Sequence, residues 1–327
     1  MNYIVFDLEW NQGSPGGGEE VKEIPFEIID VGAVKLNCER QKTDEFNQLI
    51  CPTVYRRLHH VTSKIIQLQM SDLMKGNSFI QVITEFLEWC GDDYIFCTWG
   101  SMDLVELQRN IRYYGLPPIW DRPVRYLDVQ KLFSIAYEDR KIRRSLEFAI
   151  DYLQIAKDVP FHRAFSDAYY AAKILQRIHL SVLENYSFDT FMLPLSRSEE
   201  IHVNFENYHK YISVEFADKA EALNDKEVLS TRCFLCEKTS GVKRNLRRKI
   251  KWFTINGKHY FSVSHCSEHG FVKAKIRVKK AENEGVYIVK TTKPISESEF
   301  MDLQNKKIQT SHHKKMPKMK SNKNKKK

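Results

Sequence analysis

The stretch Tyr3-Ile4-Val5-Phe6-Asp7-Leu8-Glu9 decides the fold of the first half of the chain. Four apolar residues in a row predict a buried β-strand, and two acids follow at its end. Because side chains alternate along a strand, Asp7 and Glu9 are expected to point to the same face. Two like charges this close indicate a bound cation. An exposed strand end that carries two acids by chance is the alternative for this triplet alone.

The segments that follow this strand in the sequence predict a mixed α/β sheet flanked by helices. Strands expected at 28–36 and 45–50 form an antiparallel meander with the first strand, and alternating strands and helices follow. The later elements are a helix from 79 to 90, a strand at 94–99, a helix beginning after 101, a strand at 126–129, helices at 129–136 and 145–153, and a last helix at 166–180 with Ser166 as its N-cap. Such sheets bind ligands at the carboxyl ends of their strands, where the acidic motifs fall.

Two further acids lie in the first turns of expected helices. For both Asp103 and Asp167, helix capping and the dipole give a sufficient structural explanation. They do not explain the segment Phe161-His162-Arg163-Ala164-Phe165-Ser166-Asp167, in which a loop histidine precedes the acid by five residues. At this spacing both side chains are able to face one pocket. Structural roles are expected for the other acids near strands, Glu27, Asp30 and Asp128.

Across about residues 1 to 180 these motifs resemble, in order, those of the DEDDh exonucleases, a family of the ribonuclease-H-like superfamily that includes DnaQ-type proofreading subunits. The family's D-x-E motif is similar to Asp7-Leu8-Glu9, its second-motif Asp is similar to Asp103, and its H-x4-D motif is similar to His162 and Asp167. Within the family the chain most resembles the KapD-like and histone-mRNA-exonuclease-like group. It departs from the pattern at Ser63, where many members have Gly, and in a longer insertion at 13–18.

The resemblance implies a 3′-5′ exonuclease that hydrolyses single-stranded nucleic acid, with RNA favoured over DNA. It implies that Asp7, Glu9, Asp103 and Asp167 hold two Mg2+ or Mn2+ ions, with Asp7 bridging both, and hard ions of this kind prefer carboxylate oxygens. Two ions about 3.5 to 4 Å apart stabilise the attacking and leaving oxygens of a phosphodiester. His162 then takes the proton from the attacking water, because an imidazole titrates near neutral pH.

The neighbours of the first acids leave alternatives open. Leu8 and Trp10 flank the site and either pack against the terminal nucleotide or belong to the core, with core slightly favoured for Trp10. A different class of function is a nucleic-acid-binding or scaffolding protein in which the nuclease fold is catalytically inactive. The acids present at every motif position argue against it. A DNA-directed 3′-5′ exonuclease is the other alternative.

Charge divides the 327 residues into an acidic front and a basic rear. Residues 1–227 carry 25 Lys and Arg against 35 Asp and Glu, a net charge of −10, whereas residues 228–300 carry 16 against 6, a net charge of +10. Residues 301–327 hold 10 Lys and one acid. Because basic side chains replace counterions along phosphates, this division favours a rear that holds a polyanion on which the front acts. A solubilising tail is the alternative for the last residues.

Cysteine and histidine spacing predicts a zinc site in the rear. Cys233 and Cys236 form a C-x2-C pair, and Cys266 and His269 form a C-x2-H pair after 29 intervening residues. Pairs with these spacings are typical of one tetrahedral, structural Zn2+ in a zinc-ribbon-like fold. Between the pairs, Asn256-Gly257 flanked by apolar residues predicts a β-hairpin. His265 remains a possible fourth ligand in place of His269.

Basic and aromatic residues in the rear favour a nucleic-acid-binding module. Lys243, Arg244, Arg247, Arg248, Lys249 and Lys251 precede the hairpin, and Lys273, Lys275, Arg277 and Lys279 alternate along a later strand. Aromatic residues lie between these clusters, which suits single-stranded nucleic acid, most of all RNA. A basic face exposed only to water is the alternative.

The expected organisation has four parts. They are an exonuclease domain at 1–186, a connector at 187–227, a basic zinc-ribbon-like domain at 228–300, and a disordered Lys-rich tail at 301–327. No apolar run approaches the ~20 residues that span a bilayer, so no membrane is expected. The odd number of cysteines and the absence of a charged leader favour a reducing, cytoplasmic location. No protein partner is inferred.

Overall fold

The computed structural model describes residues 1–13, 20–66, 68–120, 123–231, 233–236, 246–254, 259–281 and 284–313. The chain divides into two compact units, residues 1–192 and 193–327. No helix among the described residues has the length and apolar character needed to cross a membrane. The expected Asn256-Gly257 turn and the lysines from 314 onward lie outside the described residues, as does most of the insertion at 13–18.

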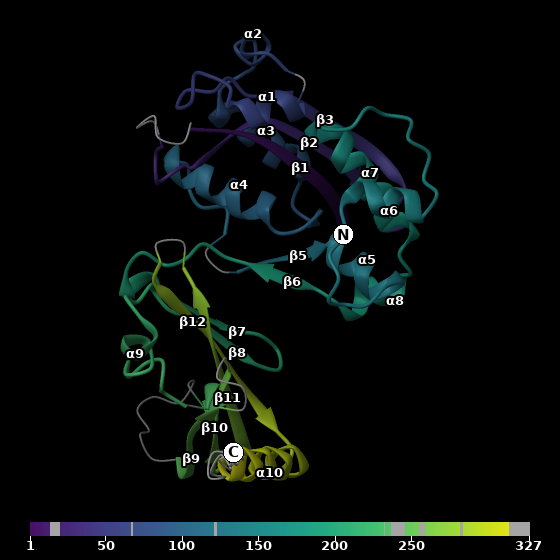
Figure 1. Ribbon diagram of the computed structural model, residues 1–327. Coiled ribbons are helices and arrows are strands. Elements are labelled where there is room, and N and C mark those ends of the chain that lie inside the picture. Colours follow the sequence, from purple (N-terminus) through teal and green to yellow (C-terminus); the bar gives the residue numbers. More distant parts are fainter. Residues whose placement is uncertain are drawn as a thin grey trace, which may run out of the picture. The chain divides into compact units, whose positions relative to one another are not determined.

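A six-stranded mixed sheet forms the first unit (Figure 1). Its strand order is β3-β2-β1-β4-β5-β6, and β1 pairs antiparallel with β2 and parallel with β4. The strands are β1 (Asn2–Gln12), β2 (Phe26–Leu36), β3 (Lys42–Leu49), β4 (Tyr94–Thr98), β5 (Val124–Asp128) and β6 (Phe188–Thr190). The predicted mixed sheet is therefore confirmed, with the opening strand at its centre.

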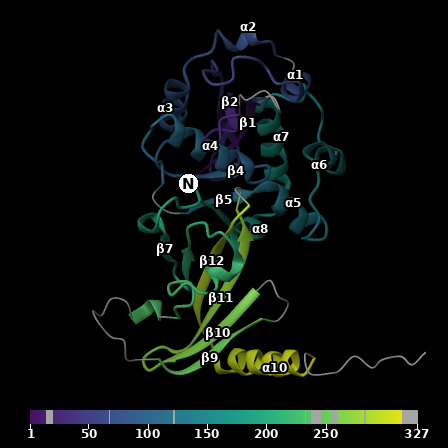
Figure 2. The same cartoon turned by 60° about the vertical axis from the view of Figure 1, so that its left-hand side comes forward.

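Helices cover both faces of this sheet (Figure 2). They are α1 (His60–Ile66), α2 (Met70–Leu73), α3 (Phe79–Cys90), α4 (Met102–Tyr113), α5 (Val129–Tyr137), α6 (Leu146–Tyr152), α7 (Ala164–Arg177) and α8 (Leu180–Asn185). Alternation along β1 divides its side chains between two cores. Tyr3 and Val5 pack with α5, α6 and α7, whereas Ile4 and Phe6 pack with α3 and α4. Asp7 and Glu9 share the parity of Val5 and therefore face α7.

The start of α7 differs from the expected one. The helix begins at Ala164, its N-cap residue is Arg163, and Ser166 is buried inside the first turn. A Ser followed by an acid is a common capping signal, but tertiary contacts outweigh it here. Asp167 remains in the first turn of the helix, as predicted.

The second unit is built on another six-stranded sheet, of order β7-β8-β12-β11-β10-β9. The strands are β7 (Ile201–Asn204), β8 (His209–Ile212), β9 (Leu246–Thr254), β10 (His259–Cys266), β11 (Gly270–Lys280) and β12 (Val286–Ile295). The short helices η1 (Arg197–Glu199), α9 (Lys219–Ala222) and η2 (Phe234–Cys236) precede β9, and α10 (Glu297–His313) follows β12. The predicted separate β-rich module is confirmed, but it begins earlier than residue 228.

Two of the expected segment boundaries need correction. Residues 187–227 are not a connector, because they contribute β6 to the first sheet and β7 and β8 to the second. All four residues of β8 are buried, so the segment belongs to a core despite its polar sequence. The tail expected from residue 301 is wrong for residues 301–313, which belong to α10, and the rest of it lies outside the described residues.

Candidate active site and zinc cluster

Strand β1 places Asp7 and Glu9 next to the N-terminal end of helix α7. In the sheet register Asp7 lies opposite Gly32 and Glu9 lies opposite Asp30, and a bulge follows between Glu9 and Trp10. The bulge shifts the alternation of side chains after Glu9. The pair Asp7 and Glu9 therefore marks the last regular positions of the strand before its pairing changes.

Helix α7 brings Asp167 to this pair because β2 has a glycine where the helix approaches. A Cβ atom on Gly32 would lie 1.9 Å from the backbone nitrogen of Phe165, so only glycine permits this contact. One carboxylate oxygen from each of Asp7, Glu9 and Asp167 lies within 4.8 Å of the others. The positive end of the helix dipole also favours the negative charge of Asp167.

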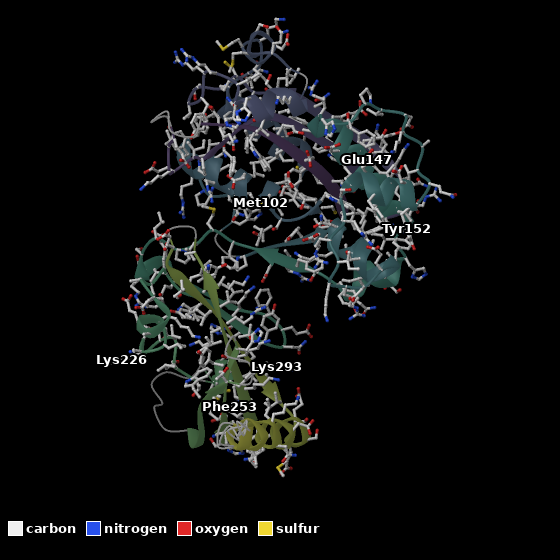
Figure 3. The ribbon with its side chains drawn as sticks, in the orientation of Figure 1. Met102, Glu147, Tyr152, Lys226, Phe253 and Lys293 are labelled. Carbon is white, nitrogen blue, oxygen red and sulfur yellow. The ribbon has the colours of Figure 1, made fainter. Side chains whose placement is uncertain are left out.

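Asp103 approaches the same strand from helix α4. It follows Met102, the first residue of α4 (Figure 3), and is 5% exposed. Its Oδ1 atom accepts a hydrogen bond from the backbone N–H of Leu8 at 3.2 Å. The side chain of Asn110 fixes α4 to β2, since it accepts from the N–H of Ile28 at 3.1 Å. Asp103 is not one of the three carboxylates within 4.8 Å, but its charge raises the pKa of Asp7.

Burial and mutual repulsion raise the pKa values of these acids. Burial raises the pKa of Asp7 well above its usual range, with Asp103 and Glu9 adding to the shift. Burial and the charge of Asp167 raise the pKa of Glu9 to about 8, and burial raises that of Asp103 to about 7. The Oδ1 atom of Asp167 is buried without a hydrogen-bond partner among the described residues. Four carboxylates in this state fit a hard divalent cation, which would neutralise their repulsion.

His162 stands at the rim of the cluster. Its side chain is exposed, and its backbone has a φ of +69°, a left-handed conformation that is uncommon for residues other than glycine. Burial raises the pKa of Asp167, whereas the ring and the backbone N–H of His162 lower it. His162 and Asp167 therefore lie close together, as their spacing predicts. An exposed imidazole beside a carboxylate cluster is placed to exchange protons with water.

The other acids have structural partners. Glu27 accepts hydrogen bonds from the backbone N–H groups of 53, 54 and 55, which hold the loop after β3. Asp128 is the N-cap of α5 and accepts from the N–H of Lys131 at 2.9 Å. Asp30 pairs with the guanidinium of Arg163, with 2.8 Å between Oδ2 and Nε. These contacts agree with the structural roles expected for the three acids.

Leu8 and Trp10 differ in their availability to a ligand. Leu8 is 3% exposed and packs in the core between the sheet and helices α3 and α4. Its burial favours the core role, one of the two alternatives that the sequence left open, and a nucleotide contact by Leu8 stays an untested prediction. Trp10 is only partly buried, and its ring lies 5.6 Å from that of Phe26. Both alternatives for Trp10 therefore stay open: its ring packs against the core, and its exposed part is accessible to a nucleotide.

The motifs did not identify two residues that position the site. Gly32 permits the approach of α7, and Arg163 ties the start of α7 to Asp30. In the sequence, a glycine within the apolar run 28–36 signals a close backbone approach, but it does not name the partner. No signal indicates the ion pair of Arg163, because 133 residues separate its two members.

The predicted zinc ligands come together in the second unit. Ligand atoms of Cys233, Cys236, Cys266 and His269 lie within 4.8 Å of one another. The Nδ1 atom of His269 is 3.0 Å from the sulfur of Cys236 and 3.7 Å from that of Cys266. His265 belongs to β10 and packs edge-on against Phe271. Of the two histidines left open by the sequence, the cluster therefore contains His269.

Each pair forms a tight turn around its first thiol. Cys233 precedes η2, and Cys266 and His269 bracket the hairpin between β10 and β11, which Gly270 closes with a φ of +71°. Burial raises the pKa of the Cys266 thiol, but hydrogen bonds from the backbone N–H groups of 268 and 269 and from the side chains of Cys236 and His269 outweigh burial and lower the pKa to about 7. Three thiols and an imidazole in this arrangement fit the donor set of a structural Zn2+ site.

Comparison with known proteins identifies the first unit. Residues 4–175 match a family model described as "Exonuclease", the RNase T family. No curated protein matches the sequence. The nuclease domain of 3'hExo, a DEDDh family member, bound to rAMP, is 20% identical, with a TM-score of 0.46 over 56% of this chain and 92% of that one. Cell-death related nuclease 4 is 16% identical, with a TM-score of 0.46 over 57% and 65%. E. coli exonuclease I in complex with an oligonucleotide is 12% identical, with a TM-score of 0.43 over 56% and 42%.

Proposed function

The chain belongs to the RNase T exonuclease family, and from this premise we propose that it removes nucleotides from the 3′ end of single-stranded nucleic acid, RNA in preference to DNA. The carboxylate cluster carries the proposal: Asp7, Glu9 and Asp167 from two separate elements lie within 4.8 Å of one another. A cluster of acids with raised pKa values at the end of a central strand has no evident structural purpose. It suits the hydrolysis of a phosphodiester, in which negative charge must be neutralised.

We propose that Asp7, Glu9, Asp103 and Asp167 hold two divalent ions, Mg2+ or Mn2+. When bound, such ions neutralise charge on the attacking and leaving oxygens of the phosphodiester. Asp103 contributes from a fixed position, because the N–H of Leu8 and the first turn of α4 hold its carboxylate. The raised pKa of Glu9 means that proton release from this acid accompanies ion binding at neutral pH.

His162 would act as the general base. Its exposed ring lies beside Asp167, and a ring nitrogen would accept the proton of the attacking water. The loop that carries His162 is fixed where it enters α7, because Arg163, the N-cap residue of that helix, pairs with Asp30. This fixation would keep the imidazole in reach of the cluster.

We also propose that Cys233, Cys236, Cys266 and His269 hold one structural Zn2+ in the second unit. Supporting this, the four side chains come from residues 233–236 and 266–269, two segments separated by 29 residues in the sequence, and the structure brings them together. A metal that joins them would fix the end of the second sheet.

The test uses RNA and DNA oligonucleotides of the same sequence, labelled at the 5′ end and carrying either a free or a chemically blocked 3′ hydroxyl. The expected result with Mg2+ or Mn2+ is a ladder of products shortened from the free 3′ end, formed faster from RNA. Equal cleavage of free and blocked substrates would disprove the 3′-to-5′ direction, and faster trimming of DNA would disprove the preference for RNA.

A further inference from the structure

Strand β11 separates apolar and basic side chains between its two faces. Val272, Ala274 and Ile276 point into the unit and are at most 1% exposed. The positions between them carry Lys273, Lys275, Arg277 and Lys279, which we call the basic row. Successive members lie two residues apart, roughly 6.6 to 6.8 Å along the strand. The basic row is thus a straight line of cations on the outer face of the second sheet.

Helix α10 neutralises one end of the basic row. Lys273 lies directly opposite Lys293 of β12, and the carboxylate of Glu299 reaches both, at 3.7 Å and 3.5 Å. The ring of Phe300 stacks on that of Phe271 with 4.1 Å between centroids, which fixes α10 at this end of β11. The helix therefore lies against part of the outer face (Figure 2), and its Glu299 supplies one acid to that face.

The middle of the basic row lacks such an acid. Lys275 is half-buried, and burial lowers its pKa, as do the charges of Arg277 and Lys273. The Nε atom of Arg277 is buried, with no hydrogen-bond partner among the described residues. In that part of the chain neither Lys275 nor Arg277 pairs with a carboxylate. Two adjacent, partly desolvated cations without an acid are unfavourable, and a bound anion would relieve the repulsion.

Aromatic rings lie beside these two cations. Phe261 of β10 is opposite Lys275, whose Nζ lies 5.8 Å from the ring centroid. Phe253 of β9 is opposite Phe261, and their ring centroids are 6.0 Å apart. Both rings are partly exposed. Rings next to a line of cations suit single-stranded nucleic acid, because unpaired bases stack while the cations hold phosphates.

We propose that the outer face of β11 binds a single-stranded nucleic acid, with phosphates at Lys275 and Arg277 and a base on Phe261. The inference rests on the proposed function only for the identity of the polymer, since the surface shares no residue with the carboxylate cluster. Glu299 competes with the polymer for Lys273 and Lys293. The helix that carries Glu299 thus limits how strongly this face holds its ligand.

The experiment measures binding of a 5′-fluorescein-labelled oligouridine to the full chain by fluorescence anisotropy over a range of salt concentrations. The chain carries Asp7→Asn, no divalent ion is added, and a gel checks the length of the probe afterwards. Lys275→Ala and Arg277→Ala should each weaken binding about fivefold at 0.1 M salt, the effect of losing a counterion-release slope of about 0.7. Each should also lower the measured slope by about that amount.

Lys226→Ala is the matched control. Lys226 is an exposed lysine of the same unit on the side that carries α9, whereas Lys293 belongs to the outer face (Figure 3). It should leave the affinity and the slope unchanged. Lys275→Ala and Arg277→Ala binding like Lys226→Ala would overturn the proposal, and so would equal affinity for an RNA duplex.

A second variant keeps the test decisive if a basic-row variant folds poorly. Glu299→Gln removes the competing charge from a half-exposed side chain and should strengthen binding, by up to about fivefold. Unchanged or weaker binding would count against the proposal. A probe that is shortened despite Asp7→Asn would contradict the catalytic assignment, while the ranking of the basic-row variants would still decide the binding surface.

Discussion

The acids near the strand ends of the exonuclease domain fall into two groups with different surroundings. Glu27, Asp30 and Asp128 each have a hydrogen-bonding or ionic partner that explains their burial. Asp7 and Asp167 instead face other acids, and burial together with this repulsion raises the pKa of Asp7. The clustering of Asp7 and Asp167 with another acid, Glu9, therefore distinguishes them from acids that pair with a base or hold backbone N–H groups.

His162 gives the sharpest prediction at the scale of one residue. Replacement by Asn removes the base but leaves the carboxylates in place, so kcat should fall by about 100- to 10,000-fold while Mn2+ binding is retained. His179→Asn is the control, because His179 is an exposed N-cap of α8 whose role Asn can fulfil. Steady-state trimming of RNA and calorimetric Mn2+ titration measure the two effects. Equal kcat for both variants would exclude His162 as the base.

His209 predicts how the second unit responds to acid. Burial lowers the pKa of His209 to about 4, and His202 and Lys290 lower it as well. A folded pKa below the unfolded value of 6.5 means that the stability contribution is present above pH 6.5. It is lost as pH falls through 4, because protonation then favours unfolding. The loss is at most about 3 kcal/mol.

The measurement is hydrogen exchange of the β8 and β12 amides at pH 7 and pH 4.5, corrected for intrinsic exchange rates. In the wild type, protection should fall between these two pH values. His209→Phe keeps an aromatic ring beside Phe234 but cannot be protonated, so its protection should fall less. Acid release of zinc affects both proteins alike, and the difference between them isolates His209. The same loss of protection in both would contradict the account.

At the scale of elements, the contact of α7 with β2 positions the third acid. Gly32→Ala would place a methyl group 1.9 Å from the backbone of Phe165. Overpacking in a protein core lowers the free energy of unfolding by about 1 to 3 kcal/mol, and occasionally by more. The helix must move, and Asp167 moves with it. We therefore expect both a lower Tm and a loss of trimming activity.

Gly115→Ala separates these two effects. Gly115 has a φ of +70° and open space around its Cα, so alanine there adds backbone strain without displacing a neighbouring element. It should lower Tm but leave kcat near the wild-type value. If Gly32→Ala retained full activity at a temperature where it is folded, the contact would have no role in placing Asp167.

Elements with a strong apolar pattern, most of them in the first unit, could be predicted from the sequence. A polar strand of the second unit could not. The apolar run before D-x-E predicts a buried strand, and the apolar residues at helical spacing between 79 and 90 predict a helix with one buried face. Strand β8 has the sequence His209-Lys210-Tyr211-Ile212, and all four residues are buried. Periodicity cannot reveal such a strand, because all four of its side chains are buried and no exposed face alternates with a buried one.

The start of α7 shows the same limit. Ser166 followed by Asp167 imitates a capping signal, whereas the helix begins at Ala164 because Arg163 reaches Asp30. The H-x4-D motif still located His162 and Asp167, because the five-residue spacing between them covers the loop and the first helical turn. This holds whichever residue caps the helix. The residues that hold this turn in place come from β2, and only the folded chain brings them together.

At the scale of the whole molecule, the chain joins an exonuclease domain to a separate unit that carries the cluster of three cysteines and a histidine. The two units are compact on their own, and the cysteine cluster lies entirely in the second. Removal of zinc, or Cys236→Ser, should therefore lower the stability of residues 193–327 and leave the exonuclease domain folded. Hydrogen exchange mass spectrometry reports both units, and metal analysis should give about one zinc per chain.

Cys38→Ser is the control for this prediction. Cys38 is an exposed, free cysteine of the first unit and has no place in the cluster. It should change neither the zinc content nor the exchange of either unit. Full zinc content and unchanged exchange in Cys236→Ser would remove the zinc assignment.

The central claim is that Asp7 holds the ions that hydrolysis requires. Asp7→Asn should abolish Mg2+- and Mn2+-dependent trimming of a 5′-labelled RNA. It should not lower the Tm of the ion-free protein, because it removes one of several repelling charges. Asp128→Asn makes the same change at a buried acid that caps α5, and it should keep its activity. Trimming by Asp7→Asn at the rate of Asp128→Asn would contradict the account.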